Sequence, residues 1–550
     1  MQATLQKQIS ILKESEKKLL EENEKQQKKI ELLERNVEAL TQALLQISKQ
    51  QYGASSEKTP QYCGQLYIFE ETDEFFEADI DALPERQTVR AHKRLKRKAG
   101  DKQRLIADIP HEVVECVIDQ DEGCEVCGSE LKVIGKKNVR TEVEYIPARV
   151  KATEYIQYIY KCVDCGNSDE FPDPFIKKAD VPKPVMYRSL ASPTSVAWVM
   201  YQKYVLAVPL YRQEKEWLRM GFDLSRSNMS NWVIQCAASW LRPLYEKMHE
   251  KLLTYEIIMS DETSYQCNKE VGKKASSQSY LWLYRNGDYL GPPIALFQYT
   301  RTRAGENART FLKGFSGFLV SDAFAGYEKV ENIKRCLCWS HLRRYYIKSI
   351  PLDSRKKEIP GSAGAIGRAY CNKLFRLEKK WKELPPDERK QKRLEQSIPA
   401  LNAFFAWAKK VKTSQEPLKK ALYYTLNHEE YFKNFLQDGR IPLTNNASEN
   451  CIRPVAVARK NFLFSDTPRG AEASATVFSI IETARANEID PYEYLVYIFK
   501  TLPNIDFISQ PEILDNYMPW SETLPEACKM RKKKAKILDG EEDINENTEH

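Results

Sequence analysis

Two short apolar runs that each end in Ser-Asp constrain the fold of this chain more than any other feature. The first run ends at Asp261 and the second at Asp322, and polar or turn-forming residues follow each one. Such runs predict buried strands, each carrying a carboxylate at its C-terminal end. Because ligand sites of open α/β sheets lie outside those strand ends, we expect the two carboxylates to share a site.

A third acid, Glu449, lies in a different context. Asn445 and Asn446 precede it, and they predict a helix N-cap with Glu449 in the first helical turn. Three carboxylates together suit Mg²⁺, which prefers carboxylate oxygen. Two such ions, about 3.5–4 Å apart, can activate a water and stabilise the leaving oxygen of a phosphodiester. The alternative for each acid alone is a turn or cap residue without a ligand.

Longer motifs around these acids resemble one known family. They are Leu-Val-Ser-Asp-Ala-Phe-Ala-Gly-Tyr at 319–327, Cys-Trp-Ser-His at 338–341, Leu-Thr-Asn-Asn-Ala-Ser-Glu-Asn-Cys-Ile-Arg-Pro at 443–454 and Arg-Lys-Asn-Phe-Leu-Phe at 459–464. Together they resemble the transposases of insertion sequence 66 (IS-66). The resemblance implies a DDE-type catalytic domain with an RNase H-like α/β fold, in which Asp261, Asp322 and Glu449 fall on the three acidic positions.

Composition bears on the compartment and the partners. The formal net charge of +7 permits a nucleic-acid partner. Thirteen cysteines without a secretory leader favour a reducing cytosol, with metal ligands and buried thiols instead of disulfides. No apolar stretch approaches the ~18 residues that a membrane helix needs. With the resemblance, this predicts a cytoplasmic, nucleoid-associated bacterial protein that has DNA and no membrane as its partner.

Residues 1–50 carry a heptad repeat. Leucine and isoleucine fill most of the repeating positions, and Asn23 lies at an a position. This pattern predicts a parallel coiled-coil homodimer whose register Asn23 fixes. The alternative is a long helix that docks on its own protein. The family resemblance adds small accessory proteins of the same element as expected partners.

Residues 51–120 are predicted to form a charged linker. Its sequence is acidic at 70–81 and basic at 86–104, with few apolar residues. Lys96, Arg97 and Lys98 in the basic part are candidate DNA contacts, because they can neutralise phosphates. A solvated linker explains the same charges.

Residues 121–168 contain two Cys-x-x-Cys pairs. A glycine follows each pair, and the four cysteines are Cys124, Cys127, Cys162 and Cys165. Four thiolates suit tetrahedral zinc in a closed structural site. Segments 143–147 and 155–160 alternate like the strands of a β-hairpin, so we expect a zinc ribbon with four cysteine ligands. Four unliganded thiols are the alternative.

Residues 185–250 have a helical pattern. A helix at 210–220, a turn with Gly221 and a second helix from Ser225 resemble a helix-turn-helix. Arg226, Asn228 and Asn231 would then face bases or phosphates. A helical hairpin that packs on the catalytic domain explains the same pattern.

Residues 253–500 are predicted to form the RNase H-like catalytic domain. Strands at 280–284 and 294–299 fit a β-meander after the Asp261 strand, which should lie beside the Asp322 strand. Glu262 follows Asp261 directly and should point to the opposite face of the strand, so it is not assigned as a ligand. His341 is a candidate neighbour of the active site.

The long segment between Asp322 and Glu449 predicts a helical insertion at about 350–440. Its basic residues, Arg393 among them, suggest either a DNA-holding surface or a solvated face. After Glu449, the candidate contacts to phosphates are Arg453, Arg459 and Lys460. Residues 501–550 should end in a disordered tail from Lys529 onward.

Together these features predict a multidomain α+β protein with a coiled coil, a zinc ribbon, helix-turn-helix-like helices and a catalytic domain. The expected function is DNA transposition with two Mg²⁺ ions, for which Mn²⁺ can substitute, and a structural Zn²⁺. Two alternatives remain open. One is a catalytically retired transposase that acts as a DNA-binding protein, and the other is a metal-dependent nuclease without strand transfer.

The coiled-coil assignment gives a first prediction. A peptide of residues 1–50 should be helical, and its melting temperature should rise with peptide concentration because association buries the heptad leucines. Circular dichroism at two concentrations measures both properties. A peptide that stays unfolded at high concentration would contradict the assignment.

Overall fold

The computed structural model describes residues 26, 27, 29, 37, 41, 150–161, 176–287 and 289–530. The chain divides into two compact units, residues 67–151 and the remaining residues, and every element named below belongs to the second unit. Almost all of the predicted coiled coil, the basic linker and the four zinc-ribbon cysteines lie outside the described residues. Within the described part, no helix is long and apolar enough to cross a membrane.

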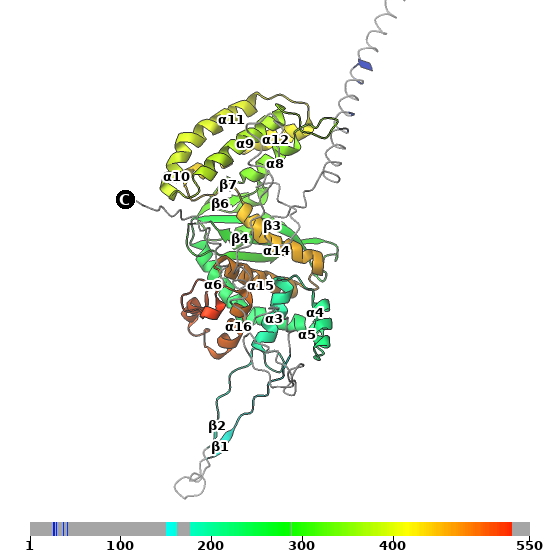
Figure 1. The fold of residues 1–550 in the computed structure, drawn as a ribbon, viewed down its shortest axis with the longest axis vertical. Coiled ribbons are helices and arrows are strands. Elements are labelled where there is room, and N and C mark those ends of the chain that lie inside the picture. Colours follow the sequence, from blue (N-terminus) through cyan, green and yellow to red (C-terminus); the bar gives the residue numbers. More distant parts are fainter. Residues whose placement is uncertain are drawn as a thin grey trace, which may run out of the picture. The chain divides into compact units, whose positions relative to one another are not determined.

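A five-stranded mixed sheet organises the second unit (Figure 1). Its strand order is β5-β4-β3-β6-β7, with β3–β4 and β4–β5 antiparallel and β3–β6 and β6–β7 parallel. The strands are β3 (Ile257–Gln266), β4 (Gln278–Asn286), β5 (Ala295–Thr300), β6 (Gly317–Ser321) and β7 (Ile333–Leu337). The predicted β-meander and the predicted neighbourhood of the Asp261 and Asp322 strands are both present.

The predicted end of the first strand was wrong. Asp261 lies in the middle of β3, whereas Asp322 directly follows β6 as expected. The reason is the second partner of β3. Pairing with β6 stops at Met259, but the antiparallel ladder with β4 continues to Gln266 and keeps the chain extended.

Helix α15 (Pro468–Ala486) closes the β5 edge of the sheet (Figure 1). The Ser479 hydroxyl accepts a hydrogen bond from Phe297 N at 2.7 Å, and the Thr483 hydroxyl accepts one from Ala295 N at 3.0 Å. An edge strand otherwise exposes unpaired N–H groups. Two hydroxyls of α15 therefore accept hydrogen bonds from two N–H groups on the outer edge of β5. Helix α7 (Gly305–Phe311) connects β5 to β6.

The helices before the sheet include the predicted helix-turn-helix-like pair. They are α3 (Pro193–Tyr204), α4 (Leu210–Arg219), α5 (Arg226–Cys236), a π-helical turn (Ala237–Leu241) and α6 (Arg242–Leu253). Gly221 in the turn between α4 and α5 has a φ of +89°, a value that favours glycine. The Ser225 hydroxyl then caps α5 by accepting from Asn228 N.

A bundle of helices is inserted in the sequence between β7 and the Glu449 helix, and it lies above the sheet in Figure 1. Its α-helices are α8 (Trp339–Lys348), α9 (Ala363–Lys380), α10 (Pro386–Lys392), α11 (Ile398–Lys410), α12 (Glu416–Asn427) and α13 (Glu429–Lys433). Apolar residues of this bundle share one core with Ile257, Met259 and Val320 of the sheet. The bundle is therefore packed onto one face of the strands that carry the two aspartates.

The chain ends in helices on the other side of the core. After α14 (Asn446–Phe462) and α15 come α16 (Pro491–Thr501) and 3₁₀ turns at Leu502–Asn504, Pro511–Tyr517 and Glu526–Cys528. Lys529 and Met530 pair with the backbone around Glu488 and Ile489, so the prediction of disorder was wrong for these two residues. Residues 531–550 lie outside the described part.

A short two-stranded ribbon precedes the helical region. Strand β2 (Ile176–Lys178) lies within it and pairs antiparallel with β1 (Ile159–Lys161). Among the described residues, β1 pairs with β2, and the segment 143–147, which the sequence suggested as the hairpin partner, lies outside the described part. Two lysines and one isoleucine gave β2 no alternating signal that a sequence pattern could detect.

Arg393 is buried, which contradicts its assignment to a basic surface. Its guanidinium forms two hydrogen bonds to Glu378, at 2.8 and 2.7 Å. It also donates to the carbonyl oxygens of Phe435, Asp438 and Ile441 at 2.8–2.9 Å. These contacts tie the helical bundle to the segment that leads into α14.

Replacing Arg393 tests this tie. Arg393→Met should cost about 3–5 kcal/mol of folding free energy, because it leaves Glu378 and three carbonyls without their partner. The thermal unfolding midpoint measures the loss. The control is Lys392→Ala, which removes an exposed partner of Glu395 and should cost less than about 1 kcal/mol. Equal shifts for the two variants would contradict the structural role of Arg393.

Candidate active site

The register of β3 and β6 brings Asp261 and Asp322 together. Met259 is paired with Val320 in the parallel ladder, and each aspartate lies two residues further along its chain. The two aspartates therefore follow the last paired residues of β3 and β6 at the same offset, which brings them to the same end of the parallel pair. At β7 the chain turns into α8 through Cys338, whose N–H donates to the Ser321 carbonyl at 3.1 Å.

Alternation along β3 separates Asp261 from Glu262. Met259 packs into the core of the helical bundle, and Ile258 packs into the core on the opposite face. Asp261 shares the face of Met259. Glu262 accepts hydrogen bonds from the Tyr327 hydroxyl and from Arg303 Nε, each at 2.7 Å. The hydrogen bonds of Glu262 therefore come from Tyr327 and Arg303, and its carboxylate still raises the pKa of Asp261.

Asn445 joins the three elements that carry the candidate site. It is fully buried and is the N-cap residue of α14. Its side-chain Nδ2 donates to the Ser260 carbonyl of β3 at 2.9 Å, and its backbone N–H donates to Cys338 Sγ at 3.1 Å. The sequence predicted that an asparagine side chain caps this helix, but the Asn445 side chain makes no capping hydrogen bond. It links α14 to β3 instead.

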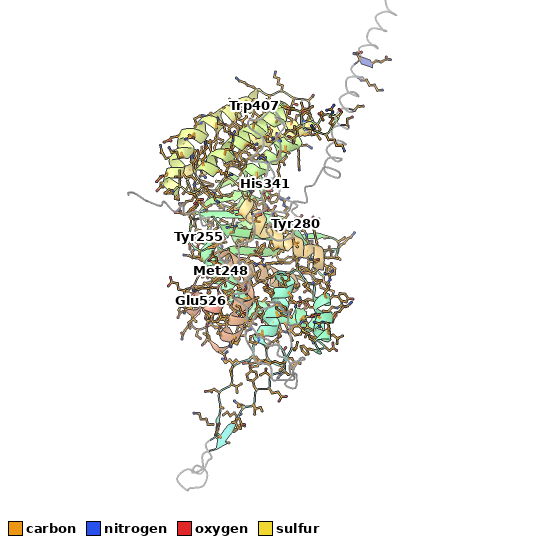
Figure 2. All side chains as sticks on the ribbon, viewed as in Figure 1. Met248, Tyr255, Tyr280, His341, Trp407 and Glu526 are labelled. Atoms are coloured by element: carbon orange, nitrogen blue, oxygen red, sulfur yellow. The ribbon has the colours of Figure 1, made fainter. Side chains whose placement is uncertain are left out.

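Glu449 lies in the first turn of α14, as predicted. Both of its carboxylate oxygens accept hydrogen bonds from Arg344 Nη2, at 2.9 and 2.6 Å. His341 Nε2 is 3.8 Å from the nearer oxygen. Arg344 and His341 are one turn apart on α8, and Figure 2 shows His341 between the sheet and the helical bundle. The sequence pattern pointed to His341 but not to Arg344, although Arg343 and Arg344 lie only two and three residues after the Cys-x-x-His motif.

Crowding of carboxylates perturbs Asp261. Burial raises its pKa well above the ordinary value, and the nearby carboxylates of Glu262, Asp322 and Glu449 raise it further. Like charges this close favour either protonation or a bound cation. The donors are carboxylate oxygens, which fit hard divalent cations. The donor types of Asp261, Asp322 and Glu449 therefore suit a divalent metal, but the ligand atoms of these three residues do not all lie within 4.8 Å of one another in this structure.

Cys338, His341 and Glu449 form a second possible ligand group. Their ligand atoms lie within 4.8 Å of one another. Burial raises the pKa of the Cys338 thiol to about 11, so the sulfur is protonated near neutral pH. It also accepts the Asn445 N–H. Burial and then Arg344 lower the pKa of His341, so its imidazole is favoured in the neutral form. Cys338 is better explained as a structural group than as a metal ligand.

The other predicted contact residues differ in their surroundings. Arg226, Asn228 and Asn231 are exposed on α5, and Lys460 is exposed near the end of α14. Arg459 is instead engaged with β3, where its Nη1 donates to the Ser264 hydroxyl at 2.8 Å and to the Thr263 hydroxyl at 3.2 Å. Arg459 therefore contacts the strand that carries Asp261.

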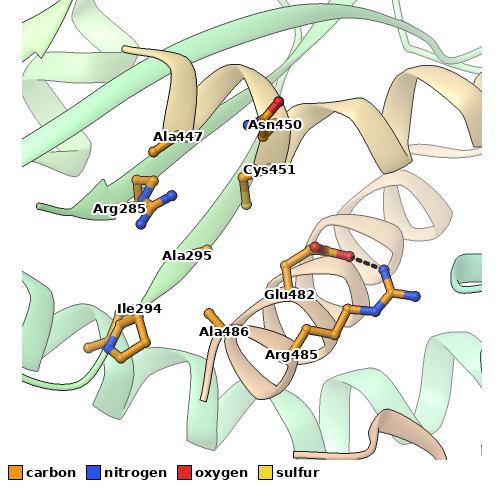
Figure 3. Close-up of a pocket in the computed structure, with 10 residues that line it drawn as sticks. Arg285, Ile294, Ala295, Ala447, Asn450, Cys451, Glu482, Arg485 and Ala486 are labelled. Atoms are coloured by element: carbon orange, nitrogen blue, oxygen red, sulfur yellow. Dashed lines mark hydrogen bonds and ion pairs between the residues drawn. The ribbon is translucent and has the colours of Figure 1, made fainter. Parts of the chain in front are cut away.

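A cavity of about 290 Å³ lies beside the same helix. Ala447, Asn450 and Cys451 of α14 line it, together with the ion-paired residues Glu482 and Arg485 of α15 (Figure 3). The Glu449 contacts described above come from α8 and do not include the lining of this cavity.

Family models match three parts of the chain. The model described as "Transposase IS66 family" matches residues 188–473. A model for the zinc-finger binding domain of transposase IS66 matches residues 121–166, and one for the IS66 C-terminal element matches residues 479–520.

Similar proteins of known sequence come from Sinorhizobium fredii. The uncharacterized protein y4qI is 27% identical over 508 residues, which is 88% of each chain. The uncharacterized protein y4hP is 28% identical over 434 residues, or 75% of each chain. A solved structure, the Drosophila P element transposase strand transfer complex, is 13% identical and covers 54% of this chain and 92% of its own, with a TM-score of 0.32. A similarity this low does not establish a shared fold or function.

The hydrogen bonds that Asn445 makes to β3 and to Cys338 lead to a stability prediction. Asn445→Ala should cost about 1–3 kcal/mol, because the buried Ser260 carbonyl loses its amide donor. Thermal unfolding measures the cost. Asn450→Ala, at an exposed position of the same helix, should stay within about 0.5 kcal/mol of the unaltered protein. Indistinguishable midpoints for the two variants would show that the junction adds no stability.

Proposed function

This chain belongs to the IS66 transposase family, and from that membership we propose a specific reaction. It binds the ends of an insertion sequence, cleaves them by metal-dependent phosphodiester hydrolysis and joins the released 3′-OH ends to target DNA. The observation that carries the proposal is the convergence of Asp261, Asp322 and Glu449 from two neighbouring strands and one helix N-terminus.

The three acids would hold two Mg²⁺ or Mn²⁺ ions. When bound, such ions lower the pKa of a water and stabilise the leaving oxygen of a phosphodiester. The contribution of the chain itself is geometric. The parallel ladder fixes Asp261 against Asp322, and Asn445 fixes the start of the Glu449 helix against β3. No side-chain nucleophile takes part, so no covalent link between protein and DNA forms.

Exposed residues of α4 and α5 are proposed to contact DNA. The Tyr211 ring lies 4.6 Å from Lys215 Nζ and 6.0 Å from the Arg226 guanidinium carbon. Next to this basic and aromatic group, Asn228 and Asn231 face solvent on α5. Cations that are not neutralised by the protein fold suit phosphate contacts, and exposed amides suit base edges. Arg453, Lys460 and the basic linker with Lys96, Arg97 and Lys98 extend the proposed DNA contacts.

The N-terminal regions complete the proposed assembly. The family match over residues 121–166 covers Cys124, Cys127, Cys162 and Cys165, which supports a structural Zn²⁺ held by these thiolates. Residues 1–50 would join two copies of the chain. We place the protein with the bacterial nucleoid in the cytoplasm, acting with small accessory proteins of the same element.

A cleavage and joining assay on the terminal DNA of the element tests the proposal. Asp261→Asn and Glu449→Gln should each abolish metal-dependent cleavage and leave end binding intact, because the substitutions remove metal ligands and not DNA contacts. The readouts are 3′-OH ends, joined products and a gel shift. Asp387→Asn changes an exposed acid on α10 and should keep full activity.

The outcomes separate the alternatives. Cleavage without joining would indicate a nuclease. End binding without cleavage, even with the accessory proteins present, would indicate a retired transposase. Loss of binding together with cleavage in Asp261→Asn would indicate an unfolded site.

A further inference from the structure

Arg344 is closer to the Glu449 carboxylate than His341 is, at 2.6 Å against 3.8 Å. A single nitrogen, Nη2, lies 2.9 Å from one carboxylate oxygen and 2.6 Å from the other. The donor therefore sits between the two oxygens, where a chelated cation would also have to bind. The side chain of Glu449 is only 16% exposed, so water does not replace this contact freely.

The rest of the Arg344 guanidinium is free. Its Nε and Nη1 have no recorded hydrogen bond to the described residues, and its side chain is 32% exposed. Its backbone is fixed, because α8 packs against α9 and α12. Arg344 can therefore leave Glu449 by side-chain rotation alone, without movement of its helix.

The second arginine near the acids behaves differently. Arg303 is held by Glu262 and lies over the Phe324 ring, with 4.2 Å between the guanidinium carbon and the ring centroid. It is 3.8 Å from Asp322, too far for a hydrogen bond. Arg303 is thus held mainly by Glu262, with Asp322 as a more distant ion-pair partner. Among the described residues, Arg344 has only Glu449 as a recorded partner.

We propose that Arg344 is the built-in counter-cation of the site: it holds Glu449 in the metal-free protein and competes with the divalent cation for that carboxylate. The proposal rests on the function proposed above. Arg344 is a positioning residue, since it acts through Glu449. It keeps the acids from repelling one another before the cation arrives, and it sets the cation concentration at which the site forms.

If Arg344 competes with the cation, removing this residue should strengthen metal binding instead of weakening it. Removing Arg344 should make Mn²⁺ bind more tightly, because the cation no longer displaces a guanidinium. Coupled interactions within one protein typically change each other's affinity about 5- to 150-fold, so Arg344→Gln should lower the Kd for Mn²⁺ at least about fivefold. The metal-free variant should also melt at a lower temperature, and saturating Mn²⁺ should remove most of that difference.

Isothermal titration of the full-length, zinc-loaded protein with Mn²⁺ tests the proposal. Arg344→Lys retains the charge and should stay close to the unaltered protein. Arg309→Gln is the charge-matched control, because it removes an exposed arginine that pairs with Glu306 outside the site. In a Glu449→Gln background, Arg344→Gln should have no effect on Mn²⁺ affinity, since the carboxylate under competition is gone.

Two results would overturn the proposal in distinguishable ways. If Arg344→Gln leaves Mn²⁺ affinity unchanged or weakens it while Asp261→Asn abolishes binding, Arg344 does not compete and the metal site still stands. If Asp261→Asn binds Mn²⁺ as tightly as the unaltered protein, both this inference and the proposed metal-dependent function fail.

Discussion

The buried side chain of Asn445 joins the parts of this protein that carry its acids. Buried side-chain amides are usually hydrogen-bonded, and here the nitrogen is bonded while the buried Oδ1 has no partner among the described residues. Its Nδ2 is bonded to the Ser260 carbonyl of β3, and its backbone N–H is bonded to the sulfur at the start of α8. One residue thus sets the position of the α14 N-terminus against a strand and against a second helix. Glu449 then follows in the first turn.

Three carboxylates in one place are unfavourable for folding unless cations accompany them. Burial raises the pKa of Asp261 well above its usual range, and the other acids add to the effect. The fold places two guanidiniums beside them. Arg303 stays with Glu262 on one face, and Arg344 lies against Glu449 on the other. Such crowding of like charges breaks a local rule of stability, as functional sites commonly do.

Local patterns predicted the elements better than their ends. Apolar runs predicted the strands, because a run flanked by turns is a local property, and the two asparagines predicted the N-terminus of α14. The predicted end of β3 was wrong because pairing with β4 keeps the chain extended beyond Asp261. The predicted exposure of Arg393 was wrong because the sequence carries no signal that a charged side chain is buried. Its contacts with Glu378 and three carbonyl oxygens make the burial favourable.

The sequence by itself identified the three candidate acids, the two Cys-x-x-Cys pairs, the order of the strands along the chain and the family. These depend on residue type and spacing along the chain. Only the tertiary structure decided which side chains face the acids: Asn445 turned away from its own helix, and Arg344 reached Glu449 from a different helix. The physical reason is that such contacts join residues far apart in the chain, so their geometry exists only after strands and helices have packed.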